Sequence, residues 1–395
     1  MTNRPNVAAA VEGVVSHLHP RASYEVADHP VPTGKEEIWR FSPLVRLVPL
    51  FDEASASTTS TDGRLEWAGE LPAGVTLARL TRDDAIAHRV QAPFDRLAAV
   101  ALQRSKQGIH LDVPAGMVVD HPIVIDATGL GGVAFGRTLV TIGANAQVTL
   151  VVRYGGVAAY GEHVVVEVGD GARVDVVSVQ NWAPGSVHGG QRSFLVGRDA
   201  HLKTVTVSLG GDVVRLMETA RFAGPGGELE QFGLYVVDAG QHIEHRLFVD
   251  HNEPHTVSRV DYRGALQGQG AHSVWVGDVL IRKSALSIDT YEANKNLMLT
   301  DGCRADSVPN LEIETGQIEG AGHSSATGRF DDEQLFYLCS RGIPEQEARR
   351  LVVHGFFADI IRRIGVPEIE RALLADVEAE LTPSVGPDHE EHDHA

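Results

Sequence analysis

The middle of the chain is built from short stretches in which apolar and polar residues alternate. Valines dominate residues 164–168 and 174–179, and they are interrupted by Glu167 and Asp175. A period of two places successive side chains on opposite faces and predicts β-strands. A glycine turn separates the two stretches, so the local unit is strand, turn, strand, with no helix between.

This unit recurs along the chain. Glycine turns begin at Gly143, Gly169, Gly197 and Gly224. A repeat that cannot bury its own apolar face must stack on its neighbours. A β-only repeat of about 26 to 28 residues is typical of one coil of a parallel β-helix, whereas a propeller blade needs about 40 residues. We therefore predict a mainly β fold with a parallel β-helix core over residues 108–330.

Helical patterns lie at both ends of this core. Spacing typical of helices over residues 6–18 and 83–106 predicts an N-terminal helical region, residues 1–107, with a Ser/Thr-rich loop at 52–63. A C-terminal helical domain is predicted over 331–382, followed by a disordered acidic and His-rich tail, 383–395. Its first long helix should open at Pro344, and its apolar positions are Ala348, Leu351, Val352, Phe356, Ile360 and Ile364.

A second C-terminal helix is predicted over residues 368–381. Its apolar stripe is narrow and consists of Ile369, Leu373, Val377 and Leu381. The helical pair therefore needs a surface that covers it, and the open end of the β-helix is the simplest one.

One histidine lies where the strand pattern gives way to a helix. Alternation over residues 311–315 predicts a strand, and Asp331 with Gln334 predicts a helix start before Leu335. Between these patterns the chain runs through Gly320 and Gly322 to His323. The sequence thus places His323 at a junction between strand and helix.

Composition limits the classes of function. The chain has 34 basic and 53 acidic residues, a net charge of −19, which argues against a nucleic-acid partner. No apolar run approaches the roughly 18 to 20 residues of a membrane span, and no signal core is present, so a cytoplasmic protein is expected. Two cysteines, Cys303 and Cys339, exclude a disulfide framework.

Residues 301–341 closely resemble the C-terminal signature of the SufB/SufD family of iron-sulfur cluster assembly scaffold proteins. The runs GHSSAT at 322–327 and RFDDEQ at 329–334 are similar to the SufD type, because SufB-type sequences typically carry a Glu where Ser324 stands. Upstream, EIWRFSPL at 37–44 resembles the family motif Glu-x-Trp-Arg-Tyr-(Thr/Ser)-x-Leu. The resemblance spans roughly residues 36 to 365.

The resemblance carries several expectations about fold and partners. It implies a right-handed β-helix and a non-catalytic scaffold subunit, which forms a heterodimer with a SufB-like paralogue through β-helix edge strands around 285–320. It also implies a SufC-like ATPase docked on the C-terminal helices, for which Pro344, Leu351, Phe356 and Ile360 are the candidate residues. A reduced flavin could associate with the complex. The chain lacks the phosphate-binding loop motif Gly-x-x-x-x-Gly-Lys-(Ser/Thr). Its only Gly-Lys pair, at Gly34, has no glycine five residues before it.

The candidate chemistry centres on His323. An iron-sulfur cluster usually takes four thiolates, which two cysteines cannot supply. A nascent cluster could only be shared with another subunit, and neutral imidazole is a suitable iron ligand. The resemblance implies the same role for His323, working with a cysteine of the SufB-like partner. An isolated histidine can equally be a hydrogen-bonded structural residue.

Cys303 stands, by alignment, where SufB-type sequences carry their cluster cysteine. It is a candidate ligand or a small apolar residue buried in a strand. Cys339 follows Leu335 by four residues on one predicted helix face and is expected in the core.

Two further groups could attract metal ions. His242 and Glu244 should project from one strand face, as a cation site or as a polar solvent face. The tail histidines His389, His392 and His394 are best explained by a solvated end.

Other classes of function stay open to test. A secreted β-helix enzyme acting on polysaccharide would need a signal peptide and an Asp cluster, and a hexapeptide acyltransferase a strict six-residue repeat. A structural β-helix homo-oligomer without metal chemistry is the main alternative, and a homodimer could form when the chain is expressed alone.

Overall fold

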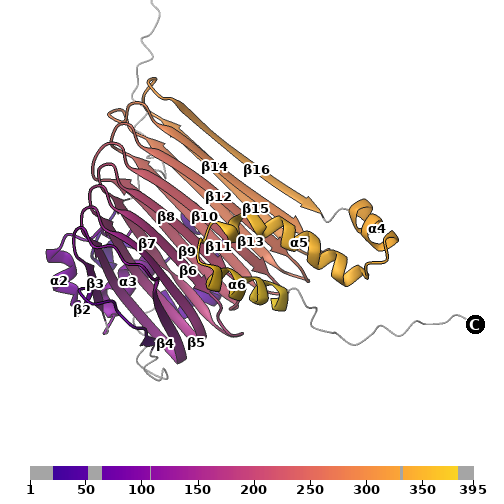
Figure 1. The fold of residues 1–395 in the computed structure, drawn as a ribbon. Coiled ribbons are helices and arrows are strands. Elements are labelled where there is room, and N and C mark those ends of the chain that lie inside the picture. The colour runs from indigo at the N-terminus through magenta and orange to yellow at the C-terminus, as the bar shows by residue number, and fades with distance from the viewer. Residues whose placement is uncertain (1–20, 52–64, 107, 330–331, 381–395) are drawn as a thin grey trace, which may run out of the picture.

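The computed structural model describes residues 21–51, 65–106, 108–329 and 332–380. The helix predicted at 6–18, the loop at 52–63 and the tail at 383–395 lie outside the described residues. Figure 1 shows a long β-solenoid with helices at its N-terminal end and along one flank.

Parallel strands stacked in two facing sheets form the predicted β-helix. One sheet runs in the order β5, β7, β9, β11, β13, β15 and the other in the order β5, β6, β8, β10, β12, β14, β16, because the long strand β5 pairs with both. The strands are β3 Ile109–Val113, β4 Ile123–Ile142, β5 Gln147–Val168, β6 Arg173–Gln180, β7 Val187–Val196, β8 His201–Ser208, β9 Val213–Phe222, β10 Glu228–Val237, β11 His242–His251, β12 Val257–Leu266, β13 His272–Ile281, β14 Asp289–Met298, β15 Arg304–Ile313 and β16 Gly320–Arg329.

The sequence repeat corresponds to one coil of the solenoid, as predicted. Val187 pairs with Val213 and Arg173 pairs with His201, which are the separations that the glycine turns predict. The coils lengthen toward the C-terminus, where Val257 pairs with Asp289. Each coil contributes one strand to each sheet.

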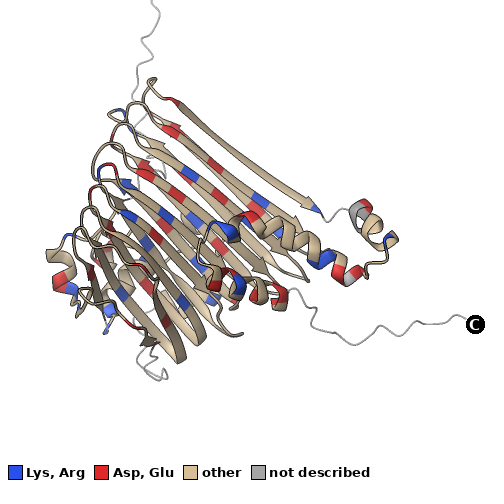
Figure 2. Cartoon of the chain, viewed as in Figure 1, with Lys and Arg blue, Asp and Glu red and all other residues tan. Residues whose placement is uncertain are grey.

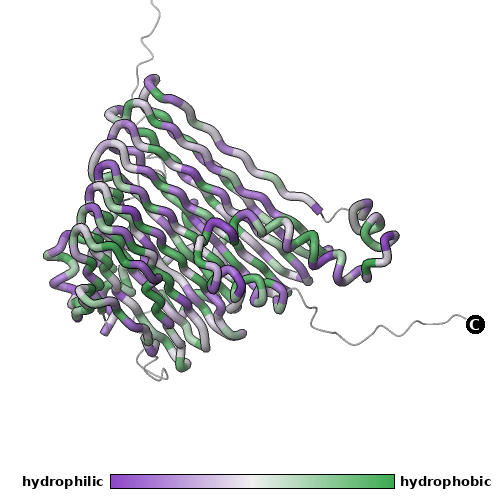
Figure 3. The backbone as a smooth tube through the Cα atoms, in the orientation of Figure 1, coloured by the Kyte–Doolittle hydropathy of each residue, from purple (hydrophilic) through white to green (hydrophobic). Residues whose placement is uncertain are grey.

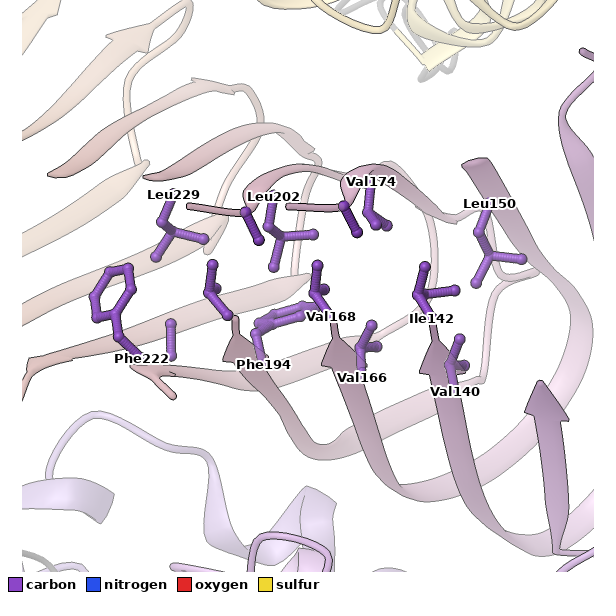
Figure 4. Close-up of a cluster of buried hydrophobic side chains, with 14 of the residues drawn as sticks. Val140, Ile142, Leu150, Val166, Val168, Val174, Phe194, Leu202, Phe222 and Leu229 are labelled. Carbon is purple, nitrogen blue, oxygen red and sulfur yellow. The ribbon is translucent and has the colours of Figure 1, made fainter. Parts of the chain in front are cut away.

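Apolar side chains stack in the interior of the solenoid, one layer from each coil. Figure 4 shows such a stack, in which Val140, Val166 and Phe194 come from successive strands of one sheet and Leu202 and Leu229 from the other. These side chains are almost fully buried. Hydrophobic and hydrophilic residues alternate along parts of the solenoid strands (Figure 3). One face of each strand is buried in this interior. A shift of one residue would turn the buried side chains outward, so burial fixes the register of the strands.

Charged residues of both signs are interspersed along the strands (Figure 2). Arg153 pairs with Asp126 at 2.6 Å and Lys203 with Asp175 at 2.9 Å, each across adjacent coils. Such exposed pairs contribute little stability, so the interior layers and not these pairs hold the coils together.

The N-terminal region contains helices, as predicted, and also two strands that were not predicted. Its elements are η1 Val26–Asp28, η2 Glu37–Trp39, α1 Leu44–Phe51, β1 Leu65–Ala68, β2 Thr76–Arg79, α2 Arg82–Ala87 and α3 Arg96–Arg104. β1 pairs with β4 and β2 with β3, so this region is continuous with the solenoid. The side chains of Thr81 and Asp95 cap the starts of α2 and α3.

The C-terminal helices are α4 Asp332–Ser340, α5 Glu345–Arg362 and α6 Pro367–Glu380. Val353 and Phe357 of α5 and Leu373 of α6 pack on Val205 and Leu234 of the outer sheet face. The expectation that these helices cover the open end of the β-helix is therefore wrong. They follow the apolar outer face of β8 and β10, while α4 extends away from the body (Figure 1).

Candidate functional site

His323 lies inside a strand and not at a junction between strand and helix. It is the fourth residue of β16, and it pairs in register with Glu292 of β14. The strand pattern is not visible in this stretch of the sequence because Gly320, Gly322 and Gly328 have low strand propensity. The pairing with β14 supplies the extended backbone that these residues do not favour on their own.

The side chain of His323 belongs to the face of β16 that continues the interior of the solenoid. Its ladder partner Glu292 is buried inside the solenoid, and in-register parallel neighbours point to the same side. Since β16 is the last strand of its sheet, no further coil covers His323 and the residue is exposed. His323 thus stands at the open end of the stack.

Glu292 is an unusual neighbour for this histidine. It is only 1% exposed, and its Oε1 atom has no hydrogen-bond partner among the described residues. Its Oε2 atom reaches the opposite sheet beside Gly277. A Cβ atom added to this glycine would lie only 2.5 Å from Oε2. Burial and the nearby Asp278 raise the pKa of Glu292 to about 8. At neutral pH this side chain is mostly a neutral acid.

Further along β14, the side-chain amides of Asn294 and Asn296 are hydrogen-bonded to groups of both sheets. Tyr235 donates to the Oδ1 atom of Asn296 at 2.7 Å, and Asn294 donates to the Tyr235 hydroxyl at 2.9 Å. Ser307 of β15 donates to Asn294. Polar side chains therefore connect both sheets just inside the open end.

The last strands of both sheets have free edges. Within the described part of the chain, β15 pairs only with β13, and β16 pairs only with β14. β15 carries Pro309 at its centre, a residue that lacks a backbone donor and is tolerated at edges. β16 is composed almost entirely of small residues. Unpaired edges of this kind are templates for a strand from another chain.

Cys303 lies outside the reach of His323. It sits in the turn before β15, half-buried, with its thiol 3.5 Å from the carbonyl oxygen of Gly268. The neighbouring Asp301 contacts Arg329 at 3.2 Å, at the far end of β16. His323 is six residues from Arg329, or about 20 Å along the strand. The two candidate ligands therefore do not share one site in this chain.

Cys303 and Cys339 differ from expectation in their surroundings. Cys303 packs partly against the interior cluster that contains Trp275, but from a turn and not from a strand. Cys339 lies in α4, as predicted, yet it is only half-buried.

His242 and Glu244 share one strand face, as predicted, but this face is not exposed to solvent. Both are buried on the outer side of β11, because the N-terminal region covers this part of the sheet. Glu244 accepts a hydrogen bond from Ser42 at 2.7 Å and contacts Arg215 at 3.4 Å. Burial opposes its ionisation, but Arg215, His242 and Arg246 together outweigh burial, so the pKa of Glu244 is held well below its usual range.

Arg215 of β9 binds the N-terminal region to the outer face of this sheet. It is fully buried, donates to Asp95 at 2.7 Å, and stacks on Trp39 at 3.7 Å from the ring centre. The run containing Trp39 was singled out in the sequence only by its resemblance to a family motif. Its physical role is to hold the N-terminal region on the solenoid.

A second buried ion pair lies inside the solenoid and was not predicted. Glu162 of β5 accepts hydrogen bonds from Arg192 at 2.7 Å and from Tyr154 at 2.8 Å, with His188 at 3.3 Å. Burial alone would raise the pKa of Glu162, but Arg192 and His188 lower it to about 2. Glu162 and Arg192 are 30 residues apart in the chain. Their contact can be predicted only when the length of this coil is known.

The comparison with known proteins bears on these features directly. Residues 123–356, more than half of the chain, match the SufBD core domain of SUF system FeS cluster assembly. The chain belongs to the SufB/SufD family. Membership supports a role in iron-sulfur cluster assembly, and the matched region contains His323 and both free strand edges.

Relatives of the SufB/SufD family add detail. An iron-sulfur cluster assembly SufBD family protein of Mycobacterium tuberculosis is 48% identical over 386 residues, which are 95% of this chain and 96% of that protein. SufD of Escherichia coli is 27% identical over 194 residues, 49% of this chain and 45% of that protein. SufD of Bacillus subtilis is 26% identical over 227 residues, 54% and 48% respectively. Within the family, this chain is SufD-like.

The four residues considered for ATPase docking fall into two groups. Pro344 and Leu351 are exposed, with 47% of Leu351 accessible, and Phe356 is half-buried. Ile360 is fully buried against the solenoid, so it holds α5 in place and offers no surface to a partner. The helix is apolar on more than one side, and the 3.6-residue period alone does not separate its two apolar faces.

No helix among the described residues is long and apolar enough to cross a membrane. Within the same residues, no three His, Cys, Asp or Glu side chains converge as they do around a bound metal ion.

Proposed function

We propose that this SufB/SufD family member is a non-catalytic scaffold subunit of a Suf complex, in which it binds a SufB-like paralogue and a SufC-like ATPase. The observation that carries the proposal is the exposure of His323 on the last strand of the solenoid, between two free strand edges. A histidine in this position is accessible to groups supplied by another chain.

The free edges support pairing with a paralogous solenoid. A partner strand laid along β15 or β16 would satisfy their unpaired backbone groups and continue a sheet across the interface. The small side chains of β16, such as Ser324 and Ala326, permit close approach. Such pairing would bring partner residues beside His323.

At that interface His323 would act as an iron ligand of the nascent cluster. Neutral imidazole binds iron well, and a partner thiolate would supply the sulfur donor that this chain does not place there. The cluster is cargo, held only until transfer. One nitrogen ligand in place of a thiolate, together with the exposed position, favours later release of the cluster.

Exposed apolar residues support a docking surface for the ATPase on α4 and the first half of α5. Phe336 is 76% exposed, Tyr337 55% and Leu351 47%. Exposed aromatic residues gathered on projecting helices are typical of interaction sites. Reduced flavin as an electron source of the complex stays a prediction.

Anaerobic co-expression with the SufB-like and SufC-like proteins tests the proposal. Native mass spectrometry should show one complex with all three proteins, and His323→Ala should leave its composition unchanged while its iron and sulfide fall to background. Ser325→Ala, two residues further on the same strand face, is the matched control and should keep both. Unchanged iron and sulfide in His323→Ala would contradict the site.

The same free edges fit a second copy of this chain, so a structural homo-oligomer is the competing candidate. The co-expression experiment separates the two. A homo-oligomer that persists in the presence of the paralogue and contains no iron or sulfide would replace the scaffold proposal.

A further inference from the structure

Two histidines face each other on the outer side of the sheet, remote from His323. His242 begins β11 and His272 begins β13, and the two are in-register neighbours. Their Nδ1 atoms are 3.2 Å apart, whereas their ring centres are 4.8 Å apart. The rings therefore approach each other through these nitrogens and diverge behind them, as imidazoles do when both bind one atom.

A carboxylate lies behind each ring. The Nε2 atom of His242 is 3.2 Å from the Oε2 atom of Glu244, and the Nε2 atom of His272 is 2.7 Å from the Oδ2 atom of Asp306. Arginines contact both carboxylates: Arg215 and Arg246 are 3.4 Å from Glu244, and Arg304 donates to Asp306 at 2.7 Å. Carboxylates held in this way accept hydrogen bonds only.

These contacts favour the tautomer of each ring in which Nε2 carries the hydrogen. A neutral imidazole has one N–H group, and the carboxylate draws it to Nε2. The Nδ1 atoms of His242 and His272 then present two lone pairs to each other across 3.2 Å. Facing lone pairs repel unless a positive species lies between them.

We propose that His242 and His272 bind a borderline divalent transition-metal cation, such as Zn²⁺, between their Nδ1 atoms. Two nitrogen ligands at about 2.0 to 2.1 Å from a tetrahedral ion are roughly 3.3 to 3.4 Å apart, close to the separation here. A carboxylate on the remote nitrogen is the usual second partner of a metal-bound histidine. Glu244 thus orients a ligand and is not one itself.

The site is open and reaches solvent on one side. The His272 side chain is 20% exposed and that of His242 is 4% exposed. No third His, Cys, Asp or Glu of the described residues joins the two nitrogens, so water or a small ligand would complete the coordination. This cation site does not depend on the function proposed for His323.

Zn²⁺ titration of the full-length chain by calorimetry tests the site. The tail histidines would compete, so all variants carry Ala at His389, His392 and His394. His272→Ala should then bind one Zn²⁺ fewer than this parent. His201→Ala is the matched control, because His201 also contacts a carboxylate, that of Glu230, at 3.2 Å on an outer strand face, but it faces no second imidazole among the described residues. His201→Ala should keep the parent stoichiometry.

Two further variants separate ligand loss from structural damage. His272→Gln keeps a donor for Asp306 but has no imidazole lone pair, and it should lose the same Zn²⁺ while circular dichroism stays unchanged. Asp306→Asn should weaken the site about 10 to 100-fold. Equal Zn²⁺ stoichiometry in the parent, His272→Ala and His272→Gln would overturn the proposal, and so would an equal loss in His201→Ala.

Discussion

At the scale of single residues, the environment of His323 is defined by a residue of the preceding coil. Glu292 lies beside it in the ladder, buried and without a partner for its Oε1 atom among the described residues. A neutral acid at this position avoids placing an uncompensated charge in the interior. The open end of the solenoid is therefore polar but uncharged just below the histidine.

Replacing Glu292 with Gln should stabilise the protein at alkaline pH. Burial and Asp278 raise the pKa of Glu292 from 4.5 to about 8, so the folded state binds a proton that the unfolded chain releases above pH 4.5. The resulting cost grows between these two values and is complete above pH 8, where it reaches a few kcal/mol. Gln removes this cost.

The measurement is the free energy of unfolding of Glu292→Gln and of the parent at pH 5 and pH 9. The variant should be more stable than the parent at pH 9, and the difference should shrink toward pH 5. A difference that does not change with pH would show that Glu292 is ionised in the folded protein.

Replacing Glu162 with Gln should have the opposite effect. It would leave Arg192 buried without its carboxylate, at a cost of about 3 to 5 kcal/mol near neutral pH. The pKa of Glu162 is lowered to about 2, so its stabilising contribution is present above pH 4.5 and is lost as the pH falls toward 2. Urea denaturation at pH 7 measures the cost, and a change below about 1 kcal/mol would contradict the ion pair.

Neither carboxylate could be assigned a partner from the sequence. The turns indicate a coil of about 26 to 28 residues, whereas the coils that carry Glu292 and His323 are longer, since Val260 pairs with Glu292 and Glu292 with His323. An error of one residue in the coil length moves a side chain to the other face of the strand. His323 itself was found through the family signature. Glu244 is buried because the N-terminal region covers its strand face, and the alternation of residues along the strand does not predict this.

At the scale of elements, the strands were predictable and the faces of the C-terminal helices were not. Repeated turns predict the solenoid because every coil must bury its apolar side on the next. In α5, however, apolar residues occur on two sides. Val353, Phe357 and Ile361 pack on the sheet, whereas Leu351 faces outward. Only the apolar outer face of β8 and β10 decides which side is buried.

Substitutions on these two sides of α5 should have separable effects. Leu351→Ser should change the free energy of unfolding by less than about 0.5 kcal/mol and abolish co-purification of the SufC-like ATPase. Phe357→Ala should destabilise the protein by about 3 to 5 kcal/mol, because it empties a buried site. Denaturation and pull-down of the ATPase measure the two effects. Retention of the ATPase by Leu351→Ser would move the docking surface elsewhere.

At the scale of the whole molecule, the two ends of the solenoid differ. The N-terminal region covers one end through β1 and β2, whereas β15 and β16 leave the other end open. The C-terminal helices lie along the flank and leave that end uncovered. In the proposed complex, His323 at the open end and the exposed residues of α4 would therefore contact two partners at the same time.

In the proposed complex, His323 binds the nascent cluster directly. The most direct test is pulsed electron paramagnetic resonance of the reduced cluster in the co-expressed complex, with only this subunit labelled with ¹⁵N-histidine. We expect a ¹⁵N hyperfine coupling typical of an iron-bound imidazole. A cluster that forms at full yield and shows no ¹⁵N coupling from this subunit would contradict it.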